Sequence, residues 1–285
     1  MVLFKDGKAA SLYFCPDCAD SAGLRLAVDS FAEDVELVSG VRPEVITDAA
    51  ALHGDVIIAG VVGHCPPIDG LVRRGILDLS DVEGKREVFK LQLVSSPGDG
   101  VKNALIVAGS EKRAVFYGLY HISSLMGVSP WVYWADVAPE KRDSAEFSAA
   151  ELNMTSREPS VKYRGIFLND EWPSLGSWVT SAFGGFNELF YAKVFELILR
   201  LKGNFLWPAM WSAVFSEDGA SEPLACAKLA DAYGIVMGTS HHEPMFRGGE
   251  EWKKIIGRYG SDPSWDFASS AEAITAFWED GLKRN

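Results

Sequence analysis

The sequence predicts an α/β protein. A small N-terminal α/β domain covers residues 1–140, and the first part of a (β/α)8 barrel, with about three βα units, covers residues 163–285. Two observations predict this fold class. Short apolar runs alternate with longer amphipathic stretches, which is typical of parallel strands joined by right-handed helical crossovers. After residue 163, three apolar runs each end in a cluster of polar or aromatic residues, and barrel strands release such residues at the face that holds the active site.

The first domain is expected to be a small sheet covered by helices. Apolar steps of three and four over residues 24–38 predict an amphipathic helix that ends at Gly40. A second helix is expected after Ser110, as its N-cap, with apolar residues as far as Met126. The four expected strands cover residues 11–14, 55–62, 88–94 and 104–108.

The polar, charged residues 141–162 predict a connector that can contain a short strand. Beyond it the βα alternation is regular, and Ser269 and Glu272 have the spacing of a capping box for the last helix. The three expected strands cover residues 165–168, 205–207 and 235–238. The expected helices cover residues 188–202, 222–233, 250–258 and 269–283.

Composition narrows the function classes. The 285 residues are 48% hydrophobic and carry a formal net charge of -12, which indicates a globular core and argues against a nucleic-acid partner. No apolar run is long enough to span a membrane, and no basic-then-apolar start indicates a signal peptide. We therefore expect neither a nucleic-acid nor a membrane partner.

Four cysteines are present, and Cys15 and Cys18 form one C-x-x-C pair after an expected strand. A structural zinc site needs four ligands, so a single pair is a weak indication of metal. A redox dithiol is an alternative, but free thiols without a dedicated role are the preferred interpretation. The sequence predicts neither a metal nor a cofactor.

The polar clusters at the ends of the three later strands indicate where chemistry could occur. The first cluster is Asn169-Asp170-Glu171-Trp172, the second runs from Trp207 to Trp211, and the third includes His241, His242 and Glu243. Glycoside cleavage needs a carboxylic acid and a carboxylate, which Asp170, Glu171 and Glu243 can supply. Trp172, Trp207 and Trp211 offer flat apolar faces for a sugar ring, although core packing is the alternative and for Trp211 is equally weighted.

Adjacent histidines do not form a metal motif of the H-E-x-x-H kind. We interpret His241 and His242 as hydrogen-bonding residues instead. Arg164 and Arg247 are candidate cations for an acidic sugar, with ordinary surface arginines as the alternative.

The sequence resembles the xylan α-1,2-glucuronidases of glycoside hydrolase family 115. The matching segments are GIFLNDEWP, KVFELILRLKGNFLWPAMW, GIVMGTSHHEPM followed by EEW, and, in the first domain, GSEKRAVFYGLYHIS and GVSPWVYWADV. The resemblance implies removal of glucuronic acid or its 4-O-methyl ether from glucuronoxylan or its oligosaccharides, with inversion and without a metal. It implies an extracellular or periplasmic location, and it allows a homodimer for the full-length form.

Carried over residue by residue, the resemblance implies a catalytic role for Asp170, and with it we place Glu171, His241 and His242. The expected substrate-binding residues are Asn169, Trp172, Trp207, Trp211, Glu243, Arg164 and Arg247. The family's further acidic residues lie on strands beyond Asn285, so we expect an incomplete site in a fragment that can be inactive.

Three alternatives stay open: a non-catalytic sugar-binding fragment, another glycosidase class such as a hexosaminidase, and a redox or metal protein built on Cys15 and Cys18. Three strands of an eight-stranded barrel also leave an open edge and an uncovered face. We therefore expect poor solubility or self-association.

Overall fold

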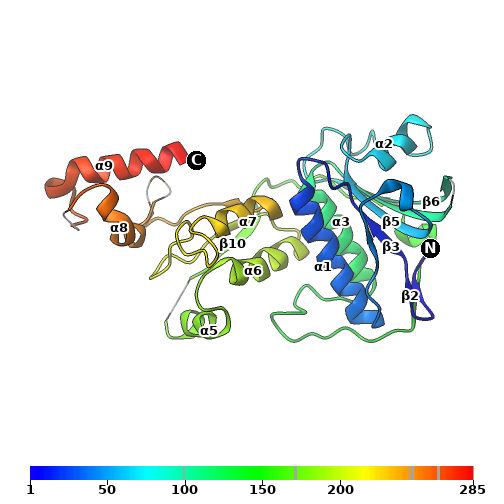
Figure 1. Ribbon diagram of the computed structural model, residues 1–285, viewed down its shortest axis with the longest axis horizontal. Helices are drawn as coiled ribbons and strands as arrows, with labels where there is room; N and C mark the ends of the chain where they lie inside the picture. Colours follow the sequence, from blue (N-terminus) through cyan, green and yellow to red (C-terminus); the bar gives the residue numbers. More distant parts are fainter. Residues whose placement is uncertain (99, 170–171, 244, 246, 262–263, 285) are drawn as a thin grey trace. The chain divides into compact units, whose positions relative to one another are not determined.

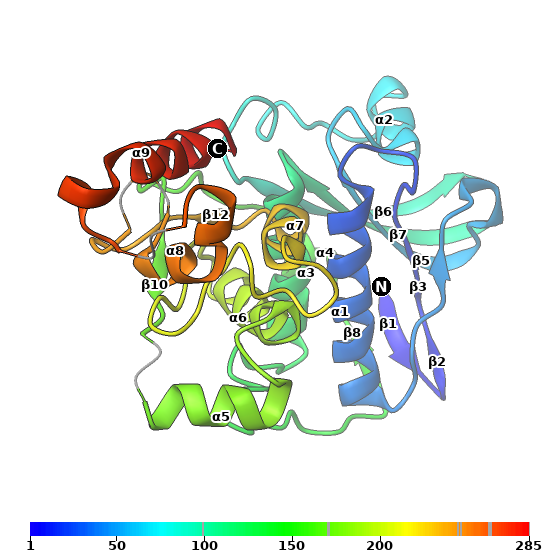
Figure 2. The ribbon, with the colours of Figure 1, turned by 60° about the vertical axis from the view of Figure 1, so that its left-hand side comes forward.

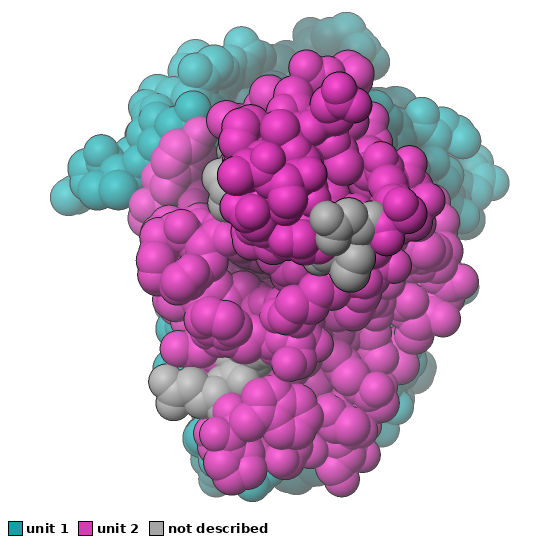
Figure 3. Space-filling view, turned by 90° about the vertical axis from the view of Figure 1, so that its left-hand side faces the viewer, with its two compact units in different colours: residues 1–162, 199–203, 232–234 teal, residues 163–198, 204–231, 235–285 magenta. Residues whose placement is uncertain are grey.

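The computed structural model describes residues 1–98, 100–169, 172–243, 245, 247–261 and 264–284 (Figure 1). They divide into two compact units (Figure 3). Unit 1 contains residues 1–162, 199–203 and 232–234, and unit 2 contains residues 163–198, 204–231 and 235–285. Residues 141–162, predicted as a connector, thus belong to unit 1.

Unit 1 is built on a mixed six-stranded sheet in the order β4-β3-β5-β7-β6-β9. The first four strands of this order are parallel, and β6 is antiparallel to both β7 and β9. The two edge strands, with two residues each, are too short to leave a pattern in the sequence. The strands are β3 (Ser11–Tyr13), β4 (Val45–Ile46), β5 (Gly54–Val61), β6 (Phe89–Gly98), β7 (Val101–Gly109) and β9 (Met154–Thr155).

Helices α1 (Ser21–Ser39) and α3 (Lys112–Leu125) lie side by side on one face of this sheet (Figure 2). Gly118 allows the close approach of α3, because a Cβ there would meet the Val107 side chain at 2.7 Å. Gly40 ends α1 in the left-handed conformation, with φ 78°, as predicted. The predicted cap of α3 is wrong: Glu111 is the N-cap, and the Ser110 hydroxyl accepts the backbone N–H of Val88 instead.

The opposite face of the sheet is covered by α2 (Pro66–Arg73) and by the chain that follows it. Ile106 and Ala108 of β7 point to this side, into a buried cluster with Ile68 and Leu71 of α2. Helix α2 was not predicted, because two prolines shortly after a glycine are typical of a loop. Burial on both faces explains why β5 and β7 are continuous apolar runs.

A second, antiparallel sheet in unit 1 has the order β2-β1-β8. Its strands are β1 (Val2–Lys5), β2 (Lys8–Ala9) and β8 (Ser144–Glu146). The short helices η1 (Ala49–Ala51) and α4 (Ala149–Leu152) complete this unit, and a capping box between Ser148 and Glu151 begins α4. The predicted connector is therefore integrated into the sheets of unit 1.

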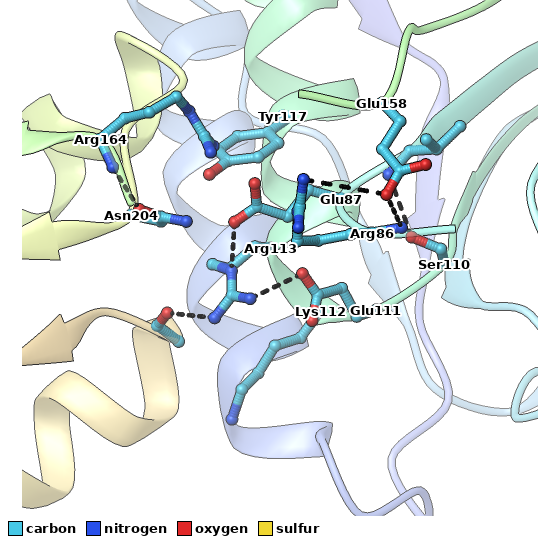
Figure 4. A network of polar contacts seen from close by, with 12 residues as sticks. Arg86, Glu87, Ser110, Glu111, Lys112, Arg113, Tyr117, Glu158, Arg164 and Asn204 are labelled. Carbon is cyan, nitrogen blue, oxygen red and sulfur yellow. Dashed lines mark hydrogen bonds and ion pairs between the residues drawn. The ribbon is translucent and has the colours of Figure 1, made fainter. Parts of the chain in front are cut away.

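Arg113 is the centre of a polar network in unit 1 (Figure 4). Its guanidinium donates to the buried carboxylate of Glu87 at 2.8 Å and to Glu111 at 2.7 Å. Its third contact, at 2.8 Å, is to the backbone carbonyl of Gly234. These charge-assisted bonds hold residues 232–234 against the rest of the unit.

Unit 2 contains a three-stranded parallel sheet in the order β10-β11-β12. The strands are β10 (Gly165–Phe167), β11 (Phe205–Trp207) and β12 (Val236–Met237), and all three were predicted. The parallel order agrees with the predicted βα alternation, while the barrel that this sheet is proposed to begin stays a prediction. Helix α5 (Ser174–Phe183) was not predicted.

Four further helices follow from the predicted apolar periodicity. They are α6 (Glu188–Arg200), α7 (Ala225–Tyr233), α8 (Gly249–Ile255), which is extended by η3 (Ile256–Arg258), and α9 (Phe267–Arg284). The predicted capping box of α9 is absent from the described hydrogen bonds: the Ser269 hydroxyl donates to Asp266 O, and Ser270 has non-helical φ and ψ. None of the helices in the described residues is long and apolar enough to cross a membrane.

Candidate functional site

Unit 2 contains a cavity of about 150 Å³ that is lined by predicted site residues. Trp211 lies in the loop after β11, and His242 and Glu243 lie in the loop after β12. Both loops leave the carboxyl ends of neighbouring parallel strands, so the sheet brings them to one edge. The full set of described lining residues is Met210, Trp211, His242, Glu243, Gly249, Glu250 and Trp265.

Aromatic side chains form one wall of this cavity. The rings of Trp211 and His242 lie 5.1 Å apart. The predicted residue His241 is not among the described lining residues, but its ring lies 4.1 Å from that of His242. Trp211 is 47% exposed, and the exposure of its apolar face distinguishes it from a core tryptophan. A flat, accessible indole beside an imidazole can accept the apolar face of a sugar ring and bond its hydroxyls.

Glu243 is held in place by local contacts. Its carboxylate accepts a long hydrogen bond from Ser240 N at 3.4 Å, and its carbonyl accepts one from Thr239 at 3.2 Å. Gly248 lies close to this side chain, because a Cβ there would lie 2.8 Å from the Glu243 carboxylate and would displace it. The loop after β12 therefore presents a carboxylate to the cavity.

Two lining side chains that were not predicted from the sequence, in addition to Gly249, complete the cavity. Glu250 lies in the first turn of α8, and Trp265, 42% exposed, comes from the polar loop before α9. Trp265 is fixed by the rings of Trp252 at 5.2 Å and Phe277 at 5.7 Å. A tryptophan in a polar loop was the one feature of the sequence that could have indicated Trp265 as a site residue. It was not predicted, because Trp265 is far along the chain from the ends of the predicted strands.

The structure corrects the expectation for Arg247. This residue is 1% exposed, and its guanidinium donates to Glu251 at 2.6 Å and lies 3.9 Å from the ring centre of Phe277. Burial acts to lower the pKa of Arg247, but the hydrogen bond and charge of Glu251 raise it above its ordinary value. Its charge is balanced inside the α8–α9 core, so it supports the cavity wall and is not positioned to bind an acidic sugar.

Arg164 is at the wrong end of its strand for the predicted role. It precedes β10, and its backbone N–H donates to the Asn204 side chain at 2.9 Å (Figure 4). Asn169 follows the other end, five residues away, which is about 16 Å along an extended chain. Strand polarity thus separates Arg164 from the carboxyl-end clusters.

The remaining predicted residues lie outside the described cavity lining. The Trp207 side chain packs against Gly238, and its ring lies 5.6 Å from the Phe167 ring, so Trp207 stabilises the packing of the sheet. Trp172 is 54% exposed and covers Gly176 of α5, while Asn169 is exposed. Asp170 and Glu171 lie outside the described residues.

A redox or metal site built on Cys15 and Cys18 was the alternative to a sugar site. In the described part of the chain, no group of three or more His, Cys, Asp or Glu side chains is arranged to hold a metal ion. Cys15, Cys18, Cys65 and Cys226 are free thiols. Burial raises the pKa of Cys65 to about 12 and that of Cys18 above its ordinary value, which disfavours the reactive thiolate.

Comparison with known proteins adds independent information. The model of Glycosyl hydrolase family 115 matches residues 156–285. A solved family GH115 4-O-methyl-alpha-glucuronidase, BtGH115A, with specificity for decorated arabinogalactans, is 31% identical, with a TM-score of 0.76, over 100% of this chain. This chain covers 35% of that protein. Comparison with curated proteins gives no match.

Two further solved structures are similar to this chain at a lower level. A Streptomyces plicatus beta-hexosaminidase is 11% identical, with a TM-score of 0.45, over 93% of this chain and 48% of its own. CpGH84D is 11% identical, with a TM-score of 0.48, over 100% of this chain and 40% of its own. At this level they add no argument about function.

Proposed function

We propose that this chain carries part of the active site of a hydrolase that removes glucuronic acid, or its 4-O-methyl ether, from a polysaccharide. The proposal starts from the family of the chain, which belongs to glycosyl hydrolase family 115. The observation that carries the proposal is the cavity at the carboxyl end of β11 and β12, which Trp211, His242 and Glu243 line. A site of this composition suits a sugar, because aromatic rings pack against its apolar face and carboxylates accept hydrogen bonds from its hydroxyl groups.

In the proposed mechanism, hydrolysis proceeds with inversion. One carboxylic acid protonates the leaving oxygen, and a carboxylate on the other side of the ring activates water. We assign Asp170 and Glu171 as candidates for one of these two carboxyl roles. His241 and His242 would orient the sugar or a carboxyl group by hydrogen bonding, while Trp211 and Glu243 would bind the sugar ring.

Glucuronoxylan is the proposed substrate, and decorated arabinogalactan is the second candidate. The second rests on the specificity of the solved relative that this chain matches at 31% identity. Family 115 chemistry on the two polysaccharides releases the same uronic acid, so the backbone to which it was attached is the variable to test.

The decisive experiment incubates the chain separately with glucuronoxylan and with a glucuronic-acid-decorated arabinogalactan. Anion-exchange chromatography measures the released uronic acid, and proton NMR of the first product identifies its anomer. Any α-linked uronate that the chain releases from one of the two substrates should appear first as the β-anomer. Asp170→Asn should lower the rate by at least 100-fold, because it removes an ionisable carboxyl group.

Asp143→Asn is the matched control, because Asp143 is an exposed aspartate in unit 1. Calorimetric titration with the uronic-acid-decorated oligosaccharides provides a second measurement. Binding without hydrolysis would favour the sugar-binding alternative over an active enzyme. Release from an N-acetylhexosaminide, or neither binding nor hydrolysis of any uronate substrate, would contradict the proposal.

A further inference from the structure

Trp265 reaches the cavity of unit 2 from a different part of the chain than the predicted site residues. It lies in the loop before α9, whereas Trp211 and His242 lie in the loops after β11 and β12. The Trp265 side chain is 42% exposed, close to the 47% of Trp211. The cavity therefore has an accessible indole on each of two separate segments.

The core between α8 and α9 fixes the position of the Trp265 ring. The ring centre lies 5.2 Å from that of Trp252 and 5.7 Å from that of Phe277, and both of these residues are fully buried. Trp278 of α9 adds an edge contact at 6.0 Å. A side chain that is already held in place loses little conformational freedom when it binds a ligand, which favours binding.

The indole N–H of Trp265 can donate to a ligand. It makes no hydrogen bond to any residue in the described part of the chain. A Cβ on Gly249 would lie 4.0 Å from Nε1 of Trp265, so the N–H edge of the ring lies beside Gly249, which also lines the cavity. Because Gly249 has no side chain, it leaves this edge of the indole uncovered.

The acidic side chains of the cavity offer the complementary kind of contact. The carboxylates of Glu243 and Glu250 can accept hydrogen bonds from sugar hydroxyl groups, but ionised carboxylates cannot donate. An indole N–H only donates. A sugar needs both kinds of partner, because its hydroxyl oxygens donate and accept, while its ether and carboxylate oxygens only accept. Trp265 thus supplies a contact that Glu243 and Glu250 cannot.

We propose that Trp265 is a further substrate-binding residue, whose indole N–H donates a hydrogen bond to an acceptor oxygen of the sugar. The inference rests on the proposed function, because the ligand is the uronic-acid-decorated oligosaccharide. It assigns different parts to the two indoles of the cavity. Trp211 provides a ring face, and the directional bond from Trp265 fixes how the sugar is turned within the cavity.

The test titrates the full chain with the uronic-acid-decorated oligosaccharide and, separately, with the same oligosaccharide after reduction of its carboxyl group to an alcohol. Calorimetry measures the affinity, and NMR follows the indole N–H signals, of which the one absent in Trp265→Phe belongs to Trp265. We expect this signal to shift saturably with the sugar. Trp265→Phe keeps an aromatic ring but loses the donor, so the affinity should fall about threefold to tenfold.

Gly249→Leu is a second variant, which leaves Trp265 itself unchanged. Its side chain would cover the N–H edge of the indole, so the affinity should again fall at least about threefold. Gly257→Leu is the matched control, because Gly257 is an exposed glycine of η3 with open space around it. Neither glycine has a positive φ. Gly257→Leu should bind the sugar like the wild type.

Each result has a defined meaning. Weaker binding of both oligosaccharides by Trp265→Phe assigns the accepting oxygen to a hydroxyl or ether group, and weaker binding of the unreduced one alone assigns it to the uronate carboxylate. Unchanged affinity in Trp265→Phe overturns the inference, as does unchanged affinity in Gly249→Leu if Trp265→Phe does not fold. The proposed function stands in that case if Trp211→Ala still weakens binding. A wild-type chain that binds neither oligosaccharide overturns both.

Discussion

At the residue scale, Lys202 makes the stability of unit 1 depend on pH. Its folded pKa of about 7 lies below its ordinary value of 10.5, so between these values the unfolded chain binds more protons than the folded one. The free energy of unfolding should therefore rise as the pH rises above 7. Below pH 7 both states are protonated, and the full cost of burying the charge is present.

The first prediction is that Lys202→Met removes this rise between pH 7 and 8.5. Chemical denaturation at several pH values should show wild type gaining stability relative to the variant by about 1–2 kcal/mol over this window. The buried thiols of Cys65 and Cys226 are present in both proteins, so their titration cancels in this comparison. Parallel pH profiles of wild type and Lys202→Met would contradict the assignment.

The second prediction concerns the buried pair of Asp34 and Arg200, whose side chains are each 4% exposed. Arg200→Met should destabilise the chain by about 3–5 kcal/mol, because it leaves the Asp34 carboxylate buried without its cation. The double variant with Asp34→Leu should recover most of this loss. Denaturant unfolding of the two single variants and the double variant measures the coupling. Additive losses would show that the pair does not act as a unit.

The third prediction concerns sugar binding at Trp211. Trp211→Ala should weaken binding of the uronic-acid-decorated oligosaccharide by about 1 kcal/mol, or roughly fivefold, through loss of a stacking face. Trp178→Ala is the control: Trp178 of α5 is 42% exposed, close to the 47% of Trp211, but does not line the cavity. Calorimetric titration measures both variants. Equal weakening by the two substitutions would assign the effect to general destabilisation.

At the element scale, the turn between α7 and β12 depends on Gly234. It has φ 72°, and a Cβ there would lie 2.9 Å from Cγ of Arg113, which donates to the Gly234 carbonyl. A side chain at residue 234 would be strained by the left-handed backbone conformation. It would also collide with Arg113, the centre of the polar network in Figure 4. This turn sets where β12 begins, and the loop after β12 carries His242 and Glu243.

The fourth prediction compares two glycines. Gly40 has φ 78° and open space around it, so Gly40→Ala should lower the free energy of unfolding by about 1 kcal/mol, through backbone strain alone. Gly234→Ala should lower the free energy of unfolding by about 2–3 kcal/mol, since it also displaces Arg113. Thermal and denaturant unfolding compare the two. A cost for Gly234→Ala no greater than that for Gly40→Ala would show that Arg113 moves away freely.

At the scale of the whole molecule, the parallel sheet of unit 2 has an exposed strand. All three residues of β10 are exposed, with Ile166 at 42% and Phe167 at 41%, and in the described residues β10 pairs only with β11. An apolar strand with one open edge is a template for pairing with another chain. This agrees with the self-association expected from the sequence.

The fifth prediction is that the chain associates at micromolar concentration and that Ile166→Lys reduces the association. Sedimentation velocity over a concentration series measures it. Ile76→Lys is the control, since Ile76 is a 36% exposed apolar residue of unit 1 outside any strand. A wild-type chain that sediments as a single monomer at all concentrations would contradict the prediction.

The sequence predicted the longer elements well because their apolar periodicity is set by burial. α1, β5 and α6 have long patterns that only one local structure satisfies. The elements it missed are short or begin in turn-like residues: β4 and β9 have two residues each, and α2 begins with two prolines. Pairing partners far along the chain stabilise such short strands, and no local pattern encodes them.

The same division holds for the candidate site. The sequence by itself determined the polar clusters after three parallel strands, because strand polarity places Trp211, His242 and Glu243 at one edge. Only the tertiary structure decided that Trp265 and Glu250 complete the cavity and that Arg247 is neutralised by Glu251 inside the core. The physical reason is that local sequence fixes backbone conformation and side-chain direction, whereas burial and charge pairing depend on segments that only folding brings together.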